Sequence, residues 1–285
     1  MTARHPRQAY SGTVRLAYAV YGESASATPL LMIMGLSGVK EDWHDLPQWL
    51  ARDRPVAVFD NRGMGDSDVP DGPYSIEQLA GDARAVLDAL DWGKAHVMGI
   101  SMGGMIAQAL SFALPDRVGR LVLGCTSDSG RLNPAPDREA MSAMMPTIGT
   151  SPRDALARAL AINYTPDWIE RNPEHFQALV DRAGQFRRRA RGMLGQISAV
   201  SRFDMADQVR QLSSSSLVIH GDKDRLIPMA NGQRLADRLP NARFEILTDC
   251  GHLFWHMDDG RSAGLIREFL ALSADPSAAS PKQWC

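Results

Sequence analysis

Short aliphatic runs alternate with segments of helical periodicity over the first 126 residues of the chain. That alternation is typical of parallel strands that are buried on both faces and connected by helices. The pattern predicts strands at 14–21, 30–34, 56–60, 95–100 and 120–124. It predicts helices at 45–52, 75–90 and 102–114, the second with Ser75 as its N-cap. The segment after the first strand is too short for a crossover helix, so that strand is expected at an antiparallel edge.

The pattern changes between residues 127 and 211, where no aliphatic strand run occurs and apolar residues recur at helical spacing. Strands are again predicted at 217–220 and 243–247, with helices near 229–239 and 261–270. We therefore expect one α/β core, a mostly parallel central sheet flanked by helices, made of residues 1–126 and 212–272. A helical cap at 127–211 interrupts it. Residues 273–285 are rich in Ser, Ala and Pro, which predicts a disordered tail.

Charge and composition exclude several classes of protein. The 31 Lys and Arg residues against 33 Asp and Glu residues give a net charge of −2, which favours neither nucleic acid nor an anionic membrane as a partner. No apolar stretch reaches the roughly 18 residues that span a bilayer, and no secretory signal is apparent at the start. Cysteines at 125, 250 and 285 form no CxxC pair, which fits a reducing compartment. We expect a cytoplasmic protein.

A candidate nucleophile lies between the strand at 95–100 and the helix at 102–114. The sequence there is GISMG, with Ser101 at its centre and a further glycine after it. A strained turn between strand and helix, with glycines that let the two approach closely, presents a serine hydroxyl above the sheet. The five-residue pattern alone is weak evidence, but the strand before it and the helix after it make it strong.

Serine is a poor nucleophile at its ordinary pKa and requires a base, which in turn requires an acid to orient it. Both residue types occur downstream at the ends of predicted strands. The sequence HGDKD, which ends at Asp224, follows one strand, and His252 follows the next after a short connector. The order along the chain is therefore Ser101, Asp224, His252. Two other carboxylates, Asp222 and Asp128, are alternatives for the acid.

Four motifs, DNRGMGDSD, GISMGG, HGDKDRLIP and CGHLF, occur in this order. Together they resemble the serine hydrolases of the α/β-hydrolase superfamily over roughly residues 10–126 and 212–271. The resemblance implies the α/β-hydrolase fold, with Ser101 as nucleophile, His252 as general base and then acid, and Asp224 as the acid that holds the imidazole tautomer. Asp224 is favoured because it leads the turn DRLIP, as the family's acid does. We interpret His220 as support for that turn, and DNRGMGDSD as scaffolding for the loops of the site.

The same resemblance places half of an oxyanion hole in the loop Met34-Gly35-Leu36-Ser37-Gly38. The hole would consist of the backbone N–H groups of Leu36 and Met102, aimed at the charge that develops on a substrate carbonyl oxygen. Members of the family commonly have His where this chain has Met34. That difference bears on the anchoring of the loop or the choice of substrate and leaves the two N–H donors unaffected.

In this superfamily an insertion at this point of the chain lies over the site. Its apolar side chains are therefore candidates for an adaptable substrate pocket. The candidates are Met141, Met144, Met145, Tyr164 and Trp168. The alternative is that apolar residues at helical spacing only pack helices together.

Neither a metal nor a nucleotide cofactor is expected. His252 and His256 have the spacing of a helical metal pair, but no Glu follows His252 and no third ligand is evident. The run Gly63-Met64-Gly65 lacks the third glycine of a dinucleotide fingerprint, and no GK[ST] phosphate loop occurs.

The resulting hypothesis is a cofactor-free serine hydrolase. It would cleave a carboxylic ester or lactone of a small to medium apolar compound through an acyl-enzyme on Ser101. The same triad also supports carbon–carbon bond hydrolysis and perhydrolysis of the haloperoxidase type. A hypothesis of a different class is a ligand receptor or signalling protein that retains the triad. The identity of the substrate and the oligomeric state do not follow from the sequence.

Overall fold

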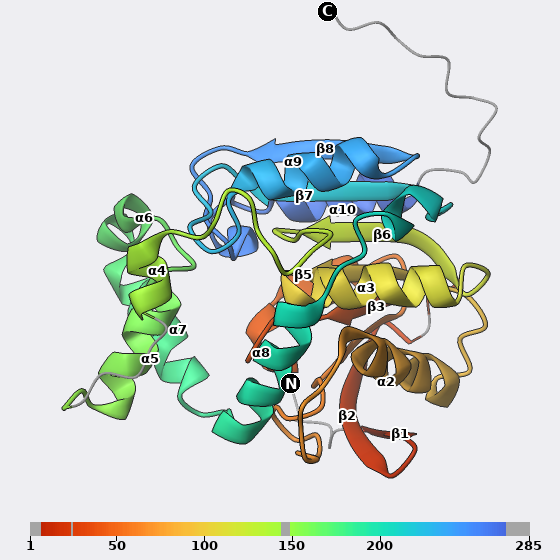
Figure 1. Cartoon of the computed structure of the whole chain (residues 1–285), viewed down its shortest axis with the longest axis horizontal. Coiled ribbons are helices and arrows are strands. Elements are labelled where there is room, and N and C mark those ends of the chain that lie inside the picture. Colours follow the sequence, from red (N-terminus) through yellow and green to blue (C-terminus); the bar gives the residue numbers. More distant parts are fainter. Residues whose placement is uncertain (1–6, 24, 144–148, 272–285) are drawn as a thin grey trace, which may run out of the picture.

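A computed structural model describes residues 7–23, 25–143 and 149–271, and an eight-stranded sheet lies at its centre (Figure 1). From edge to edge the strands are β1 (Arg7–Ser11), β2 (Val14–Tyr21), β4 (Val56–Phe59), β3 (Leu30–Ile33), β5 (Ala95–Ile100), β6 (Val118–Gly124), β7 (Ser216–Gly221) and β8 (Ala242–Leu247). β2 is antiparallel to both β1 and β4, and all other neighbours are parallel. Every residue of β3, β4, β5 and β7 is buried, as expected for a sheet covered on both faces.

The strand predicted at 14–21 is antiparallel, but its expected place at the sheet edge is wrong. It is β2, which lies between β1 and β4, while β1 forms the edge. A tight turn at Gly12 joins β1 to β2, and the φ of +61° at this residue is one that glycine adopts freely. The sequence pattern missed β1 because only Ala9 of its five residues is buried, so the strand has almost no hydrophobic signal.

Helices cover both faces of the sheet. One face is covered by α2 (Ile76–Ala89), α3 (Met102–Ala113) and α9 (Met229–Arg238), and the other by α1 (Leu46–Leu50) and α10 (Arg261–Ala271). Alternate residues of β3 belong to the two hydrophobic clusters, Leu31 and Ile33 to the first and Leu30 and Met32 to the second. This is the two-residue period of a strand whose side chains point to opposite faces.

The N-cap predicted for α2 is confirmed. Ser75 Oγ accepts a hydrogen bond from the Gln78 N–H at 3.2 Å, and the Gln78 side chain accepts one from the Ser75 N–H at 2.9 Å. This reciprocal pair satisfies two backbone donors at the start of the helix.

The chain between β6 and β7 is helical over much of its described part. It contains α4 (Arg138–Ala143), α5 (Pro152–Ala161), α6 (Pro166–Arg171), α7 (Pro173–Ala183), α8 (Ala190–Arg202) and the 3-10 helix η2 (Gln208–Gln211). We refer to α4–α8 as the cap. In Figure 1, α4–α7 project beyond the sheet at the left of the view, and α8 returns alongside the core. Met144, Met145 and the predicted tail at 273–285 lie outside the described residues.

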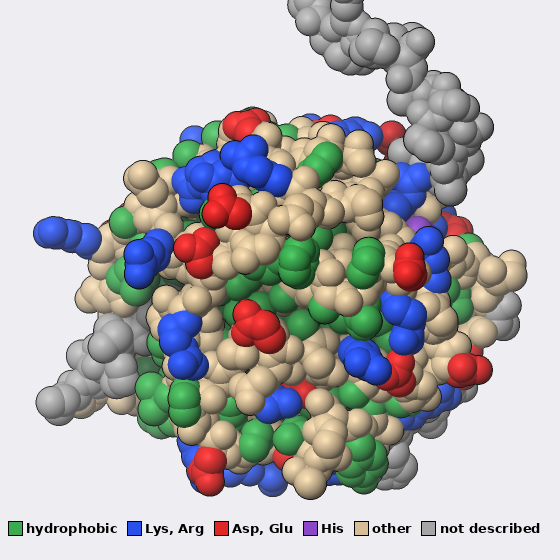
Figure 2. All heavy atoms as spheres, turned by 45° about the vertical axis from the view of Figure 1, so that its right-hand side comes forward, with side chains coloured by type: hydrophobic (Ala, Val, Ile, Leu, Met, Phe, Trp, Pro, Cys, Tyr) green, Lys and Arg blue, Asp and Glu red, His purple; other side chains and the backbone are tan. Residues whose placement is uncertain are grey.

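No helix within the described residues is both long and apolar enough to cross a bilayer. Figure 2 shows one face of the molecule, on which Lys and Arg side chains are interspersed with Asp and Glu side chains. This mixture accords with the net charge of −2.

Two glycines provide a matched test of how closely α3 packs on the sheet. A Cβ at Gly103 would lie 2.0 Å from the carbonyl oxygen of Ile33, whereas a Cβ at Gly81, on the exposed side of α2, would meet nothing within 4 Å. Gly103→Ala should therefore lower the free energy of unfolding by about 1–3 kcal/mol or more. Gly81→Ala should raise it by about 0.5–1 kcal/mol. Urea unfolding followed by circular dichroism measures both, and a Gly103→Ala protein as stable as the wild type would contradict the close approach.

Candidate active site

Three side chains singled out in the sequence lie at one edge of the sheet. Ser101 follows β5, Asp224 lies in the loop after β7, and His252 lies in the loop after β8. Strands β5, β6, β7 and β8 are parallel neighbours in that order. Their carboxyl ends therefore meet at the same edge, where open α/β sheets bind their ligands.

Ser101 has the backbone of a strained turn. Its φ of 55° and ψ of −123° are costly for a residue with a Cβ. Its N–H donates to the Gly124 carbonyl at 2.9 Å, and its own carbonyl accepts from Thr126 Oγ1 at 2.7 Å. The end of β6 thus holds both sides of the turn. A Cβ at Gly99 would lie 2.1 Å from the carbonyl oxygen of Gly103, so the turn requires glycine there.

His252 and Asp224 form a buried pair. His252 Nδ1 and Asp224 Oδ2 are 2.7 Å apart, and both residues are buried. The other carboxylate oxygen, Oδ1, accepts from the Leu226 and Ile227 N–H groups at 2.9 and 3.0 Å. Burial by itself raises the pKa of Asp224, but the charge of His252 and hydrogen bonds from His220 and His252 outweigh it. The net effect holds the pKa of this carboxyl below its usual value.

The contact with Asp224 also determines which imidazole nitrogen remains for chemistry. Because Nδ1 of His252 faces the carboxylate, Nε2 is the nitrogen that can serve a reacting group. Among the described residues no hydrogen bond joins Ser101 Oγ to His252. Such bonds are often long before substrate binds and tighten in the reacting complex.

The two alternative acids have other partners. Asp128 is fully buried and pairs with two arginines of α9. The carboxylate of Asp222 lies 3.6 Å from Lys223 Nζ. Of the three candidates, Asp224 is the one in contact with His252.

His220 supports the loop that carries Asp224. Its Nε2 lies 2.7 Å from the Ile227 carbonyl and 3.4 Å from Asp224 Oδ2, and a carbonyl can only accept, so Nε2 carries the proton. Cys125, His220 and Asp224 have potential metal-ligating atoms within 4.8 Å of one another. Burial raises the pKa of the Cys125 thiol, and the other two groups already have hydrogen-bond partners. The cluster is therefore a poor fit for a metal ion.

The loop that follows β3 lies directly against the candidate nucleophile. A Cβ at Gly35 would be 3.1 Å from Ser101 Cβ, so the loop and the turn touch. The N–H groups of Leu36 and Met102 donate to no other group within the described residues. Both are therefore available to a ligand, as an oxyanion hole requires.

Met34 anchors this loop through its backbone and by packing. Its side chain is buried and lies against Gly38, where a Cβ would come within 2.4 Å of Met34 Cγ. Its carbonyl accepts from Asn61 Nδ2 at 2.9 Å. The asparagine belongs to the DNRGMGDSD segment, which acts here as scaffolding.

A charge network centred on the buried pair Lys40 and Asp60 follows the same loop along the chain. Lys40, at the start of the 3-10 helix η1 (Lys40–Trp43), places Nζ 2.8 Å from both Asp60 and Asp66 and 2.9 Å from Glu41. Asp60 also accepts from the Lys40 backbone N–H at 2.7 Å. Burial lowers the pKa of Lys40, but the neighbouring carboxylates outweigh burial and raise it overall. The sequence reasoning did not identify Lys40, because nothing in the pattern marks a lysine as buried.

The cap residues suggested as a pocket lining have different environments. Tyr164 and Trp168 are buried, and their rings stack with 5.0 Å between centroids. They pack with Leu253, on the loop that carries His252. Met141 is 48% exposed on α4. Contact of these side chains with a substrate stays a prediction.

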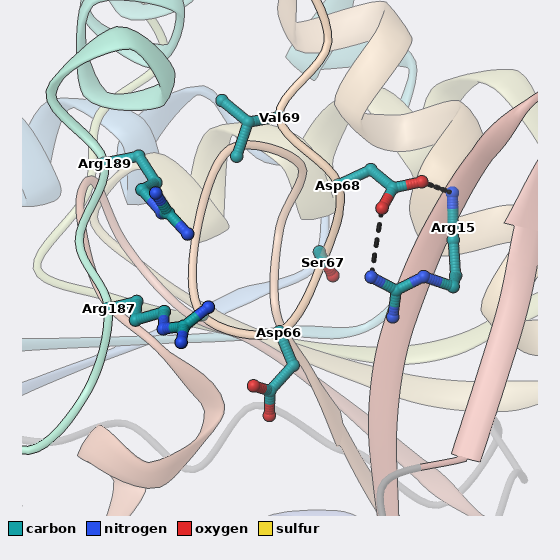
Figure 3. A pocket seen from close by; sticks show the side chains of 8 residues that line it. Arg15, Asp66, Ser67, Asp68, Val69, Arg187 and Arg189 are labelled. Carbon is teal, nitrogen blue, oxygen red and sulfur yellow. Dashed lines mark hydrogen bonds and ion pairs between the residues drawn. The ribbon is translucent and has the colours of Figure 1, made fainter.

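Two pockets open on the surface at the loops that follow β7 and β4. One, of 710 Å³, is lined by residues of α6 and by the loop that contains Asp224. The other, of 430 Å³, lies between the loop after β4 and the segment before α8 (Figure 3). There Arg15 pairs with Asp68, while Arg187 and Arg189 extend from the opposite side. The candidate nucleophile lines neither pocket.

Gln196 of α8 contacts the loop that carries Leu36, and the sequence pattern did not identify this residue. It is fully buried; its Oε1 accepts from the Ser37 N–H at 2.9 Å and its Nε2 donates to the Arg62 carbonyl at 3.1 Å. The available signal was its position on the buried face of α8, with Gly192 and Ala199 one turn away on either side. Helical periodicity identifies that face and cannot name the partners.

Comparison with known proteins supports the α/β-hydrolase fold expected from the sequence motifs. Residues 28–256 match the model of the alpha/beta hydrolase fold family. A Caulobacter segnis protein named as a proposed carbamate hydrolase, RutD, is 34% identical over 90% of this chain and 97% of its own length. 3-Oxoadipate enol-lactonase 2 of Acinetobacter baylyi is 30% identical over 82% of this chain and 85% of its own.

A solved structure shows the same architecture. The enol-lactonase from Burkholderia xenovorans LB400 superposes with a TM-score of 0.80 and 26% identity, over 93% of this chain and all of that chain. Together with the family match over most of the sequence, the strand order of the sheet and the strained turn at Ser101, this likeness places the chain in the α/β-hydrolase fold family.

Proposed function

We propose that this α/β hydrolase cleaves a carboxylic ester or lactone of a small to medium apolar compound through an acyl-enzyme on Ser101, without a cofactor. The observation that carries the proposal is the buried 2.7 Å contact between His252 Nδ1 and Asp224, at the sheet edge where Ser101 occupies a strained turn. A histidine oriented by a buried carboxylate beside a serine is the arrangement that acyl transfer requires.

In the first half of the reaction Ser101 Oγ attacks the substrate carbonyl carbon while His252 Nε2 takes the hydroxyl proton. The negative charge that develops on the carbonyl oxygen is stabilised by the Leu36 and Met102 N–H groups. The tetrahedral intermediate collapses, the bond to the leaving oxygen breaks, and His252 gives that oxygen the proton. Asp224 keeps Nδ1 protonated and stabilises the imidazolium that forms in between.

In the second half a water molecule attacks the acyl-enzyme and His252 takes its proton. Collapse of the second intermediate releases the carboxylic acid and returns the proton to Ser101. In a lactone the leaving oxygen stays attached to the acyl group, so a single hydroxy acid leaves the enzyme.

An ester or lactone carbonyl is supported by an enol-lactonase that is 30% identical over 82% of the chain. A carbamate is a second candidate, because the relative named as a proposed carbamate hydrolase is 34% identical over 90% of it. The same residues would act on a carbamate carbonyl. The two candidates differ in the product, since a carbamate ester releases its alcohol and a carbamic acid, and the carbamic acid breaks down to an amine or ammonia and carbon dioxide.

Ser101→Ala should abolish multiple turnover of p-nitrophenyl esters from acetate to decanoate, with a loss of at least about 10³-fold in kcat. The reason is that no other described group is placed to form the acyl-enzyme. A fluorophosphonate probe should label the wild type and not this variant. The control is Ser201→Ala, which alters a surface serine of α8.

A lactone and an aryl carbamate assayed in parallel separate the two candidate substrates. A wild type that releases only one equivalent of product would instead favour the receptor hypothesis.

Asp224→Asn should lower kcat by about 10⁴-fold, because an amide stabilises the wrong tautomer of His252. Asp128→Asn is the matched variant, since it alters a buried carboxylate that contacts arginines of α9. It should lose stability and keep kcat within about tenfold of the wild type. Steady-state kinetics with thermal melting tests both, and the reverse pattern would assign the acid to Asp128.

The depressed pKa of Asp224 predicts a pH dependence of stability. A carboxyl whose folded pKa lies below its unfolded value of about 3.9 contributes stability that is fully present above that value. The contribution is lost as pH falls through the folded pKa. The difference in unfolding free energy between wild type and Asp224→Asn should therefore shrink as pH is lowered below about 4. Urea unfolding at a series of pH values measures it, and a constant difference would contradict the direction of the shift.

A further inference from the structure

The side chain of Gln196 joins the cap to the loop that supplies Leu36. Gln196 lies in the middle of α8 and is fully buried. Its Oε1 accepts from the Ser37 N–H and its Nε2 donates to the Arg62 carbonyl. Because one partner is a backbone donor and the other a backbone acceptor, the orientation of the amide is determined.

The oxyanion loop needs such an anchor next to Leu36. Ser37 has a φ of 61°, a left-handed conformation that a serine keeps only when its surroundings hold it. Hydrogen bonds hold the loop on either side of this residue, from Asn61 to the Met34 carbonyl at 2.9 Å and from the Val39 N–H to Asp42 at 2.9 Å. Within the loop the Gly38 N–H donates to the Gly35 carbonyl at 3.2 Å. Gln196 supplies the contact from a distant part of the chain to the peptide that follows Leu36.

The position of Gln196 is itself determined by close packing of α8 on the core. A Cβ at Gly192 would lie 2.1 Å from the Gly63 carbonyl oxygen, and a Cβ at Gly195 would lie 2.5 Å from the ring of Tyr74. The two glycines therefore let the helix backbone approach the loop after β4 closely. Just before the helix, Arg188 Nη2 donates to both carboxylate oxygens of an aspartate of η1, at 2.7 and 2.8 Å.

We propose that Gln196 is a positioning residue for the oxyanion hole, so that α8 of the cap completes the catalytic site of the core. The inference rests on the proposed acyl transfer. Gln196 touches no reacting atom; it acts by fixing the Leu36–Ser37 peptide. This restrains Leu36 and thereby keeps the N–H of the preceding Gly35–Leu36 peptide pointed at the developing oxyanion. A group that matters for transition-state charge and not for substrate binding changes kcat and leaves KM unchanged.

Replacement of Gln196 by Leu removes both hydrogen bonds at similar volume. Gln196→Leu should lower kcat by about 10- to 100-fold with KM within about twofold, less than the loss of an oxyanion donor itself. Gln196→Glu keeps an acceptor for the Ser37 N–H and should recover part of the lost kcat. Arg202→Met is the matched control, because Arg202 also joins α8 to the core, at the Tyr74 carbonyl, and contacts no part of the oxyanion loop.

Ester kinetics, thermal melting and amide hydrogen exchange of Ser37 are measured on the four proteins. The proposal predicts that Arg202→Met lowers the melting temperature with kcat within twofold of the wild type. It also predicts faster exchange at Ser37 in Gln196→Leu, partly reversed in Gln196→Glu. A folded Gln196→Leu protein with wild-type kcat, or a kcat loss matched by Arg202→Met, would overturn it.

The same measurements separate this proposal from the proposed function. If the wild type neither turns over esters nor reacts with a fluorophosphonate, the acyl-transfer function fails. Amide exchange at Ser37 then still reports whether Gln196 holds the loop. The positioning role would be rejected if the exchange rate at Ser37 in Gln196→Leu equals that of the wild type, or if it is no faster than in Arg202→Met.

Discussion

The close approach of helix α3 to the sheet is the constraint on which the rest of the site depends. Glycines at 99 and 103 bring the helix backbone against β3 and β5 at distances that no side chain permits. The tight turn between strand and helix holds Ser101 in a backbone conformation that costs on the order of 1–3 kcal/mol. The burial of both sheet faces and the hydrogen bonds from the end of β6 offset that cost. The same contact leaves the first N–H of α3, that of Met102, next to the serine hydroxyl.

Around that turn, the core and the cap contribute different parts of the site. The loops after β7 and β8 hold the candidate acid and base, and the burial of Asp224 and His252 strengthens their interaction because water does not screen it. The cap contributes Tyr164 and Trp168, which pack on the loop of His252, and Gln196, which bonds the oxyanion loop. The cap thus contacts both loops that flank Ser101, so its packing and the geometry of the site are coupled.

Much of the fold could be predicted because hydrophobic periodicity is a local property. The strands from β3 onward and the helices between them follow from runs of aliphatic residues, and the position of Ser75 before such a run identifies it as an N-cap. Strand β1 was missed because its pairing with β2, and not its burial, stabilises it. Lys40 and Gln196 were missed because a polar residue is buried only where a distant segment supplies its partners.

The sequence by itself determined the elbow at Ser101, since its glycines, the strand before it and the helix after it are neighbours along the chain. It also determined the order of the candidate acid and base, because each follows a strand. Only the tertiary structure decided that His252 contacts Asp224 while Asp128 pairs with arginines of α9. Only the tertiary structure showed that a cap glutamine accepts a hydrogen bond from the Ser37 N–H, next to Leu36. These contacts join segments far apart in the chain, and their geometry depends on how sheet, helices and cap pack together.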